Sequence, residues 1–233
     1  ASAAGGTLYL EDASDTPGEG TLIVDNSNNT KNSSQYIPLN FDMVDGTNVL
    51  GRVVLRNRGR LRVVSGLTLK VTKGIQVAAN CAILTAAGGA IEFVGAEDAT
   101  VTGGSLITVE SLICTNAGKT IRFGTAAADK LTIPLGKTLI LRGEPGNPVT
   151  LASTTEGTRW PVTVNANAGL VDVRNVAVKD SDASSGAAVL AKLLTADGAG
   201  SGIDAYLLDG QQGSYYTDII ARLGFTPLNA NAF

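Results

Sequence analysis

Histidine is absent from this chain of 233 residues, which holds 21 acidic and 18 basic residues. The absence removes the commonest general base and the commonest metal ligand of proteins. It also excludes Ser-His and Cys-His nucleophile systems within the chain. Carboxylates are then the only route to acid-base catalysis, and we expect a chain that is not an enzyme and that binds no metal or cofactor.

Cysteines and long apolar runs are scarce as well. Cys81 and Cys114 each stand in an apolar, strand-like segment, "AANCAILTA" and "SLICTNAG", and both are interpreted as buried free thiols. No apolar run reaches the roughly 18 residues of a membrane span. The stretch "ASAAGGTLYLED" has no basic region and no long apolar stretch, so no signal peptide is visible in it, and an already cleaved one is left open. We expect no membrane insertion.

Charge is sparse and glycine is abundant. Only 17% of the residues are charged, 44% are hydrophobic and 28 are glycine. This composition is typical of many short strands joined by tight turns. The net charge of −3 and the isoelectric point near 5.0 argue against bulk binding to nucleic acid or to acidic membranes.

The pattern along the chain divides it into three parts. Residues 1–48 form an irregular segment with two turn-rich stretches, "DASDTPGEG" and "DNSNNTKNSS", and a few strands. Over residues 49–183, short segments rich in Val, Ile, Leu and Thr begin about every 8 residues. Alternation in "LTLKV" and "AIEFV" indicates strands with one buried face. In residues 184–233 the regular succession of short apolar segments stops.

The strand rhythm suits either a sandwich or a solenoid. Pairs of Asn-Gly or Asp-Gly, which mark tight hairpins, are rare between the strands. Aromatic residues make up only 5% of the chain, and small residues fill the corners where stacked coils approach closely. We therefore predict an all-β fold with a parallel β-helix or solenoid-like region of roughly six coils.

One long stretch supports this prediction, "GEPGNPVTLASTTEGTRWPVTVNANAGLVDVRNVAVKDSDASSG". Its pieces "GNPVTL", "EGTRWPVTV" and "VDVRNVAVKDSDASSG" resemble coils of right-handed parallel β-helices in bacterial and phage proteins. The resemblance implies an extracellular, structural protein, with adhesins prominent in that group. It carries no set of catalytic residues to this chain.

The last part of the chain contains one expected helix. Ser214 can cap a helix of about residues 215–223, and Gly224 followed by Pro227 ends it. The apolar stripe of this helix consists of Tyr216, Ile219, Ile220 and Leu223. So short a helix is not stable alone, and its stripe must pack on the last coil or on a partner chain.

The surrounding segment, "LLTADGAGSGIDAYLLDGQQGSYYTDIIARLGFTPLN", is similar to the linker module of bacteriophage tail fibres. The matching pieces are "DGAGSGIDA", "LLDGQQGSYY" and "ARLGFTPLN", although Tyr206 stands where the family more often has a small acidic residue. The resemblance implies a homotrimeric virion protein whose helix packs around a three-fold axis or caps the coils. Its expected partners are other virion tail or fibre proteins and a host-surface receptor.

Arginines gather in "GRVVLRNRGRLRVV", where no acidic residue is near. Arg60 and Arg62 share one strand face, and "RNRG" is expected to form a turn. One interpretation is an anion site for phosphates or acidic sugars, formed by Arg56, Arg58, Arg60 and Arg62. The alternatives are a solvated outer face and ion pairs to a neighbouring chain.

Paired carboxylates are the remaining route to catalysis, because glycosidases need two of them roughly 5 to 9.5 Å apart. The candidates are Asp172, Asp180, Asp182, Glu92 and Glu110. Turn or solvent roles are favoured, since no pair is surrounded by Trp or Tyr platforms. The lone Trp160 is interpreted as a packing residue at a corner.

The sequence thus predicts a structural component of a phage virion, a tail fibre or fibre-like attachment protein. The alternative is a bacterial β-helical cell-surface adhesin, and a less favoured one is a tailspike-type polysaccharide depolymerase. A cleaved signal peptide would favour the adhesin, and neighbouring tail genes would favour the phage.

Overall fold

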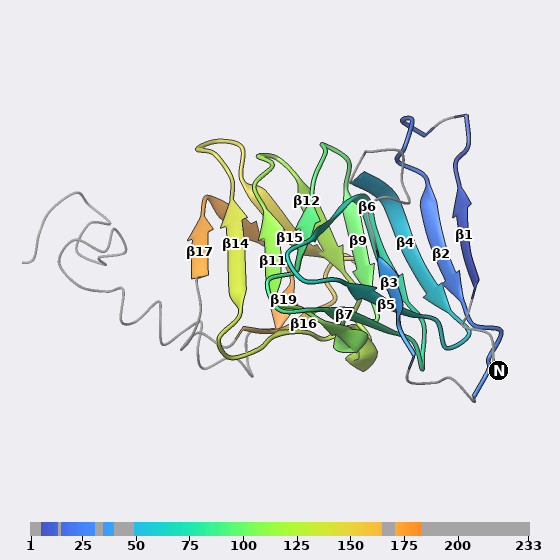
Figure 1. Ribbon diagram of the computed structural model, residues 1–233. Helices are drawn as coiled ribbons and strands as arrows, with labels where there is room; N and C mark the ends of the chain where they lie inside the picture. Colours follow the sequence, from blue (N-terminus) through green and yellow to red (C-terminus); the bar gives the residue numbers. More distant parts are fainter. Residues whose placement is uncertain (1–5, 14, 31–34, 40–48, 165–170, 183–233) are drawn as a thin grey trace, which may run out of the picture. The chain divides into compact units, whose positions relative to one another are not determined.

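The computed structural model describes residues 6–13, 15–30, 35–39, 49–164 and 171–182. These residues lie in the first of two compact units of the chain, residues 1–188 and 189–233. They form strands β1 to β19 and two single-turn 3-10 helices, and no α-helix occurs among them. The prediction of an all-β fold is confirmed for this part of the chain (Figure 1). The expected C-terminal helix lies outside the described residues.

Two long strands set the arrangement. Strand β6 (Thr68–Val77) pairs with β8 through its first half and with β9 through its second half. Strand β4 (Val49–Arg56) runs parallel to both halves of β6, with a register shift between Leu50 and Arg52. Each long strand therefore belongs to two rows of strands, and the chain changes direction within it.

The first row continues from β6 through β8 (Ala90–Phe93), β11 (Ser111–Cys114), β14 (Thr138–Arg142) and β17 (Val171–Arg174). The second row runs from β2 (Thr21–Asp25) through β4 and β6 to β9 (Ala99–Thr102), β12 (Thr120–Phe123), β15 (Val149–Ser153) and β18 (Val176–Val178). All pairings within these two rows are parallel.

The third row consists of two further parallel sheets. One contains β3 (Ile37–Leu39), β5 (Arg60–Val63), β7 (Ala82–Thr85) and β10 (Ile107–Thr108), and the other contains β13 (Leu131–Ile133), β16 (Trp160–Val164) and β19 (Ser181–Asp182). The 3-10 helices, Gly104–Leu106 and Ala127–Asp129, precede β10 and β13. Strands β2 and β3 belong to residues 1–48, so the rows extend into the segment expected to be irregular.

One strand departs from the parallel pattern. Strand β1 (Gly6–Leu10) pairs antiparallel with β2, and its five residues are exposed. It lies beside β2 at the opposite end of the rows from β17 (Figure 1).

The core consists of side chains stacked in register, one from each circuit of the chain. Leu69, Ile91, Leu112, Leu139 and Val171 occupy successive paired positions along the first row. The first four are buried. From β8 onward, each strand of the row pairs with the strand that comes three places later in the sequence, as β8 does with β11 and β11 with β14. Such parallel pairing requires the chain to complete one circuit between the two strands. The result is a mostly-β, solenoid-like arrangement with an aliphatic interior.

Gly74 marks the point where β6 passes from the first row to the second. Its φ angle is +121°, and an added Cβ would lie 2.0 Å from the carbonyl oxygen of Thr100. Only glycine combines this backbone angle with so close an approach of the next strand. Gly74 therefore fixes the corner between the first two rows.

The two cysteines are free and buried, as the sequence indicated. Burial raises the pKa of the thiols of Cys81 and Cys114, so both stay protonated and unreactive near neutral pH. No helix among the described residues is long and apolar enough to cross a membrane.

Candidate functional site: the arginine face and the paired carboxylates

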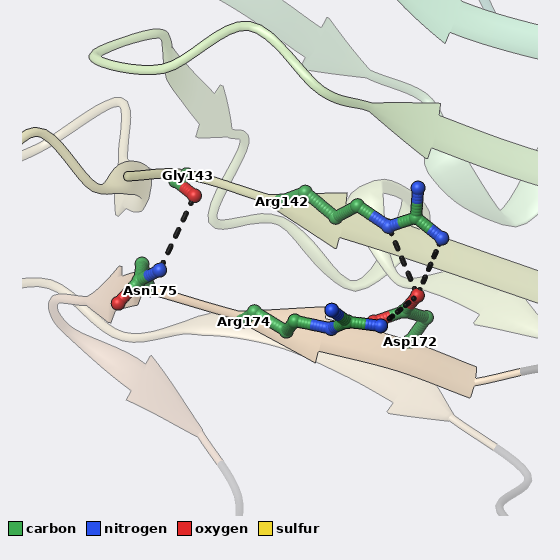
Figure 2. A network of polar contacts seen from close by, with 5 residues as sticks. All are labelled: Arg142, Gly143, Asp172, Arg174 and Asn175. Atoms are coloured by element: carbon green, nitrogen blue, oxygen red, sulfur yellow. Dashed lines mark hydrogen bonds and ion pairs between the residues drawn. The ribbon is translucent and has the colours of Figure 1, made fainter. Parts of the chain in front are cut away.

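Asp172 lies between two arginines, Arg142 and Arg174 (Figure 2). It is on the outer side of the first row, because it pairs with Ile140 and the flanking Leu139 and Leu141 are buried. Its Oδ2 accepts a hydrogen bond from Arg142 Nε at 2.9 Å, and its Oδ1 accepts one from Arg174 Nε at 2.8 Å. The hydrogen bonds from Arg142 and then Arg174 lower the pKa of the Asp172 carboxyl. A carboxylate held charged by two guanidinium groups is suited to joining strands and unsuited to donating a proton.

The two glutamate candidates form ion pairs as well. Glu110 Oε2 accepts from Lys137 Nζ at 2.6 Å, and Glu92 Oε2 lies 3.9 Å from Lys70 Nζ. Glu92 and Asp172 face outward on the same row and are separated by β11 and β14. Three strand spacings place their backbones about 14 Å apart, beyond the carboxyl separation of a glycosidase pair.

Asp180 lies in the turn before β19, the last described strand. Its φ angle is 53°, and its Oδ2 accepts a hydrogen bond from Gly157 N at 3.3 Å. Asp182 ends β19, and its side chain lies outside the described residues. Within the described part of the chain, no three His, Cys, Asp or Glu side chains gather where they could hold a metal ion.

The expected turn lies in the middle of the arginine segment, between β4 and β5. Asn57 and Arg58 both have positive φ angles, and Gly59 N donates to Arg56 O at 2.9 Å. Arg56 is engaged by Asp25, whose Oδ2 lies 2.7 Å from Arg56 Nε. Arg56 therefore differs from the other members of the predicted anion site, because Asp25 already pairs with its charge.

Arg58, Arg60 and Arg62 form the arginine face, on the turn before β5 and along β5 itself. Arg60 and Arg62 alternate with buried Leu61 and Val63, so they share one strand face, as predicted, and this face points outward. No carboxylate in the described ranges lies within ion-pair distance of these three arginines. Guanidinium groups with free donors can bind carboxylate or phosphate oxygens in pairs.

Tyr36 is the aromatic neighbour of this face. Arg60 Nη1 donates to Tyr36 Oη at 3.2 Å, and the guanidinium carbon lies 5.4 Å from the ring centroid. Arg60 Nε is buried and has no acceptor among the described residues. The arginine face therefore combines an aromatic ring with cationic groups whose hydrogen-bonding capacity is not used up.

Trp160 packs in the interior, in agreement with its interpretation as a packing residue. It is 1% exposed, and its ring stacks on Phe123 with a centroid distance of 4.5 Å. Its Nε1 donates to the carbonyl oxygen of Lys179 at 2.7 Å. Trp160 is thus not available as a platform for a sugar ring.

Sequence reasoning missed one charged residue, Lys119, which is fully buried. Its Nζ donates to three backbone carbonyl oxygens, those of Thr72 at 2.8 Å, Gly95 at 3.2 Å and Glu97 at 2.7 Å. Burial lowers the pKa of this amino group. The only signal in the sequence is a lysine directly before the strand "TIRF", a position that solvated lysines also occupy.

The residues expected at an oligomer interface, Tyr216, Ile219, Ile220 and Leu223, lie outside the described residues. Their role therefore rests on the sequence. Comparison of the chain with protein-family models, with curated proteins and with solved structures gave no significant match.

Proposed function

We propose that this chain is a structural component of a phage virion, a tail fibre or fibre-like attachment protein that contributes to host adsorption. The observation that carries the proposal is the C-terminal sequence "LLDGQQGSYYTDIIARLGFTPLN", whose pieces follow the order of the tail-fibre linker module. The proposed assembly is a homotrimer in which Tyr216, Ile219, Ile220 and Leu223 pack around the three-fold axis.

The fold proposed for the region before this module is a parallel β-helix. The pairing of β8 with β11, β14 and β17, each the third strand along the chain, supports this. The same interval recurs in β9, β12, β15 and β18. Three strands per coil and an aliphatic interior are the features that a stacked-coil fibre segment requires.

We further propose that the chain has no activity on polysaccharide. The contacts of Asp172 support this, because Arg142 and Arg174 lower its pKa whereas a general acid must hold its proton near neutral pH. Glu92 and Glu110 each have a lysine as partner, Lys70 and Lys137. Replacing Asp172, Asp180 and Asp182 by Asn should leave host binding unchanged. Release of reducing sugar from host polysaccharide by the wild type, abolished in the triple variant, would contradict the proposal.

The experiment that tests the proposed location is peptide mass spectrometry of virus particles purified from a lysate of the source bacterium. Washed envelopes of uninfected cells serve as the control. The proposal requires peptides of this chain in the particles and their absence from the envelopes. Peptides found in the envelopes alone would identify a bacterial surface adhesin and overturn the virion assignment.

A further inference from the structure

Positive charge is concentrated in one continuous part of the chain. Residues 47–91 contain seven of the 18 basic residues, Arg52, Arg56, Arg58, Arg60, Arg62, Lys70 and Lys73, and none of the 21 acidic residues. The remaining residues therefore hold 11 basic and 21 acidic groups, a net charge of −10. Positive charge is thus concentrated in β4, β5, β6 and the turn between β4 and β5, in a chain whose remaining residues are acidic on balance.

Ion pairs neutralise only part of this cluster. Asp25 pairs with Arg56, Asp15 with Lys73 at 2.6 Å, and Glu92 lies near Lys70. Four basic residues of this cluster have no carboxylate partner within the described ranges: Arg52 and the three residues of the arginine face, Arg58, Arg60 and Arg62. Arg52 lies on β4 in the second row, whereas the three residues of the arginine face lie together on β5 and on the turn before it.

The strands on either side of β5 bring no charge to the arginine face. Pro38 of β3 and Leu84 of β7 pair with Arg62, and Ala82 of β7 pairs with Arg60. Arg60 and Arg62 project from the same side of β5, about 6.6 to 7 Å apart along the strand. Along β5 the arginine face therefore presents two of its three guanidinium groups on a surface of small and apolar side chains, with Tyr36 beside Arg60.

Arg60 itself is incompletely satisfied. Its Nη1 bonds to Tyr36, whereas the buried Nε has no acceptor among the described residues. A buried donor without a partner raises the free energy of the folded state. An external oxyanion that draws the guanidinium outward would supply the missing acceptor, so the site gains from a ligand that the protein does not provide.

From this geometry we propose that the arginine face binds an acidic glycan whose oxyanion groups are spaced along a neutral sugar chain. Arg60 and Arg62 would each pair with an oxyanion, and the apolar neighbours would contact the sugar rings. A nucleic acid fits less well, because its closely spaced phosphates would extend over the acidic remainder of the surface. The inference holds for a virion protein and for a cell-surface protein alike.

The test compares three forms of one polymer: unmodified, carboxymethylated and phosphorylated dextran. Binding to the immobilised wild-type chain should occur with the two charged forms and not with unmodified dextran. Preference between the charged forms distinguishes carboxylate from phosphate as the source of the oxyanion. Raising the salt from about 0.05 M to about 0.5 M should weaken binding, because exposed charges are then screened.

The variant Arg60→Gln/Arg62→Gln should lose about tenfold in affinity for the charged dextrans, because it removes two charge pairs between the chain and the polymer. Arg52→Gln/Arg159→Gln is the matched control, because both arginines are exposed and the change in net charge is equal. Its affinity should stay within about twofold of the wild type. Fluorescence of the buried Trp160 verifies the fold of each variant. If Arg60→Gln/Arg62→Gln does not fold, the single variant Arg62→Gln takes its place.

Three results would overturn the inference. The first is a wild type that binds neither charged dextran at low salt. The second is an equal loss of affinity in the test and control variants, which would show a response to net charge alone. The third is tighter binding of a DNA duplex than of the charged dextrans, which would identify a nucleic-acid surface.

Discussion

Arg142 and Arg174 stand directly opposite each other on the neighbouring parallel strands β14 and β17. Like charges in register repel. Asp172, on β17 two residues before Arg174, accepts hydrogen bonds from both guanidinium groups (Figure 2). One carboxylate thus converts a repulsive pair into a bridge that holds β17, the last described strand of its row, against β14.

Replacing Asp172 by Asn should loosen β17. The amide keeps the size of the side chain but removes the charge that holds Arg142 and Arg174 together. We expect faster hydrogen exchange of the β17 backbone amides, with little change in the interior strands β8 and β11. Asp98→Asn, which removes the partner of Arg122, is the control and should leave β17 unaffected. Equal protection of β17 in the wild type and in Asp172→Asn would show that the bridge does not stabilise this strand.

Stability should fall in acid. Hydrogen bonds lower the pKa of Asp172 through Arg142, of Asp15 through Lys73 and of Asp25 through the backbone N–H of Ser27. The folded pKa values lie below the unfolded ones, so the folded state binds fewer protons in the interval between them. The stabilisation is complete above about pH 4, the unfolded value, and is lost as the pH falls through the folded values.

Urea unfolding monitored by circular dichroism at a series of pH values measures this loss. The free energy of unfolding should be nearly constant above about pH 5 and should decrease below about pH 4. Asp172→Asn should show a shallower decrease than the wild type. An unfolding free energy that rises or stays level between about pH 4 and about pH 2 would contradict the assignment.

Lys119 should be required for stability. Replacing it by Met fills a similar volume but leaves the carbonyl oxygens of Thr72, Gly95 and Glu97 without their donor. We expect a loss of about 2 kcal/mol in the free energy of unfolding, since buried acceptors without partners are costly. Lys179→Met, at an exposed position, is the control and should change little. Unchanged or higher stability of Lys119→Met would show that the cost of burying the ammonium group exceeds the gain from its hydrogen bonds.

The rows of strands were predictable because their signal is local. Alternation in "LTLKV" and "AIEFV" corresponds to β6 and β8, with Leu69, Val71, Ile91 and Phe93 buried. The scarcity of hairpin turns correctly favoured parallel pairing over a sandwich of antiparallel strands. The few strands expected within residues 1–48 include β2 and β3, so their existence was predictable as well. Their place in the rows was not, because it depends on their long-range partners β4 and β5.

Side-chain partners were less predictable than strands. Asp25 lies 31 residues from Arg56 in the sequence, and register between parallel strands brings them together. The same holds for Arg142 and Asp172, which are 30 residues apart. The sequence pattern identified Arg56, Arg58, Arg60 and Arg62 as one group. It did not indicate that Arg56 is neutralised, since that depends on the pairing of β2 with β4.

The solution mass of the full chain tests the proposed trimeric fibre most directly. The proposal predicts about 71 kDa at micromolar concentration, three times the chain mass of 23.8 kDa. Burying Ile219, Ile220 and Leu223 should contribute roughly 1.5–3 kcal/mol each per chain, and Ile220→Asp would place a charge in that contact. Ile220→Asp should therefore have the monomer mass with the strands still folded, whereas Thr217→Asp, off the apolar stripe, should remain trimeric. A wild-type chain with the monomer mass would contradict the proposal.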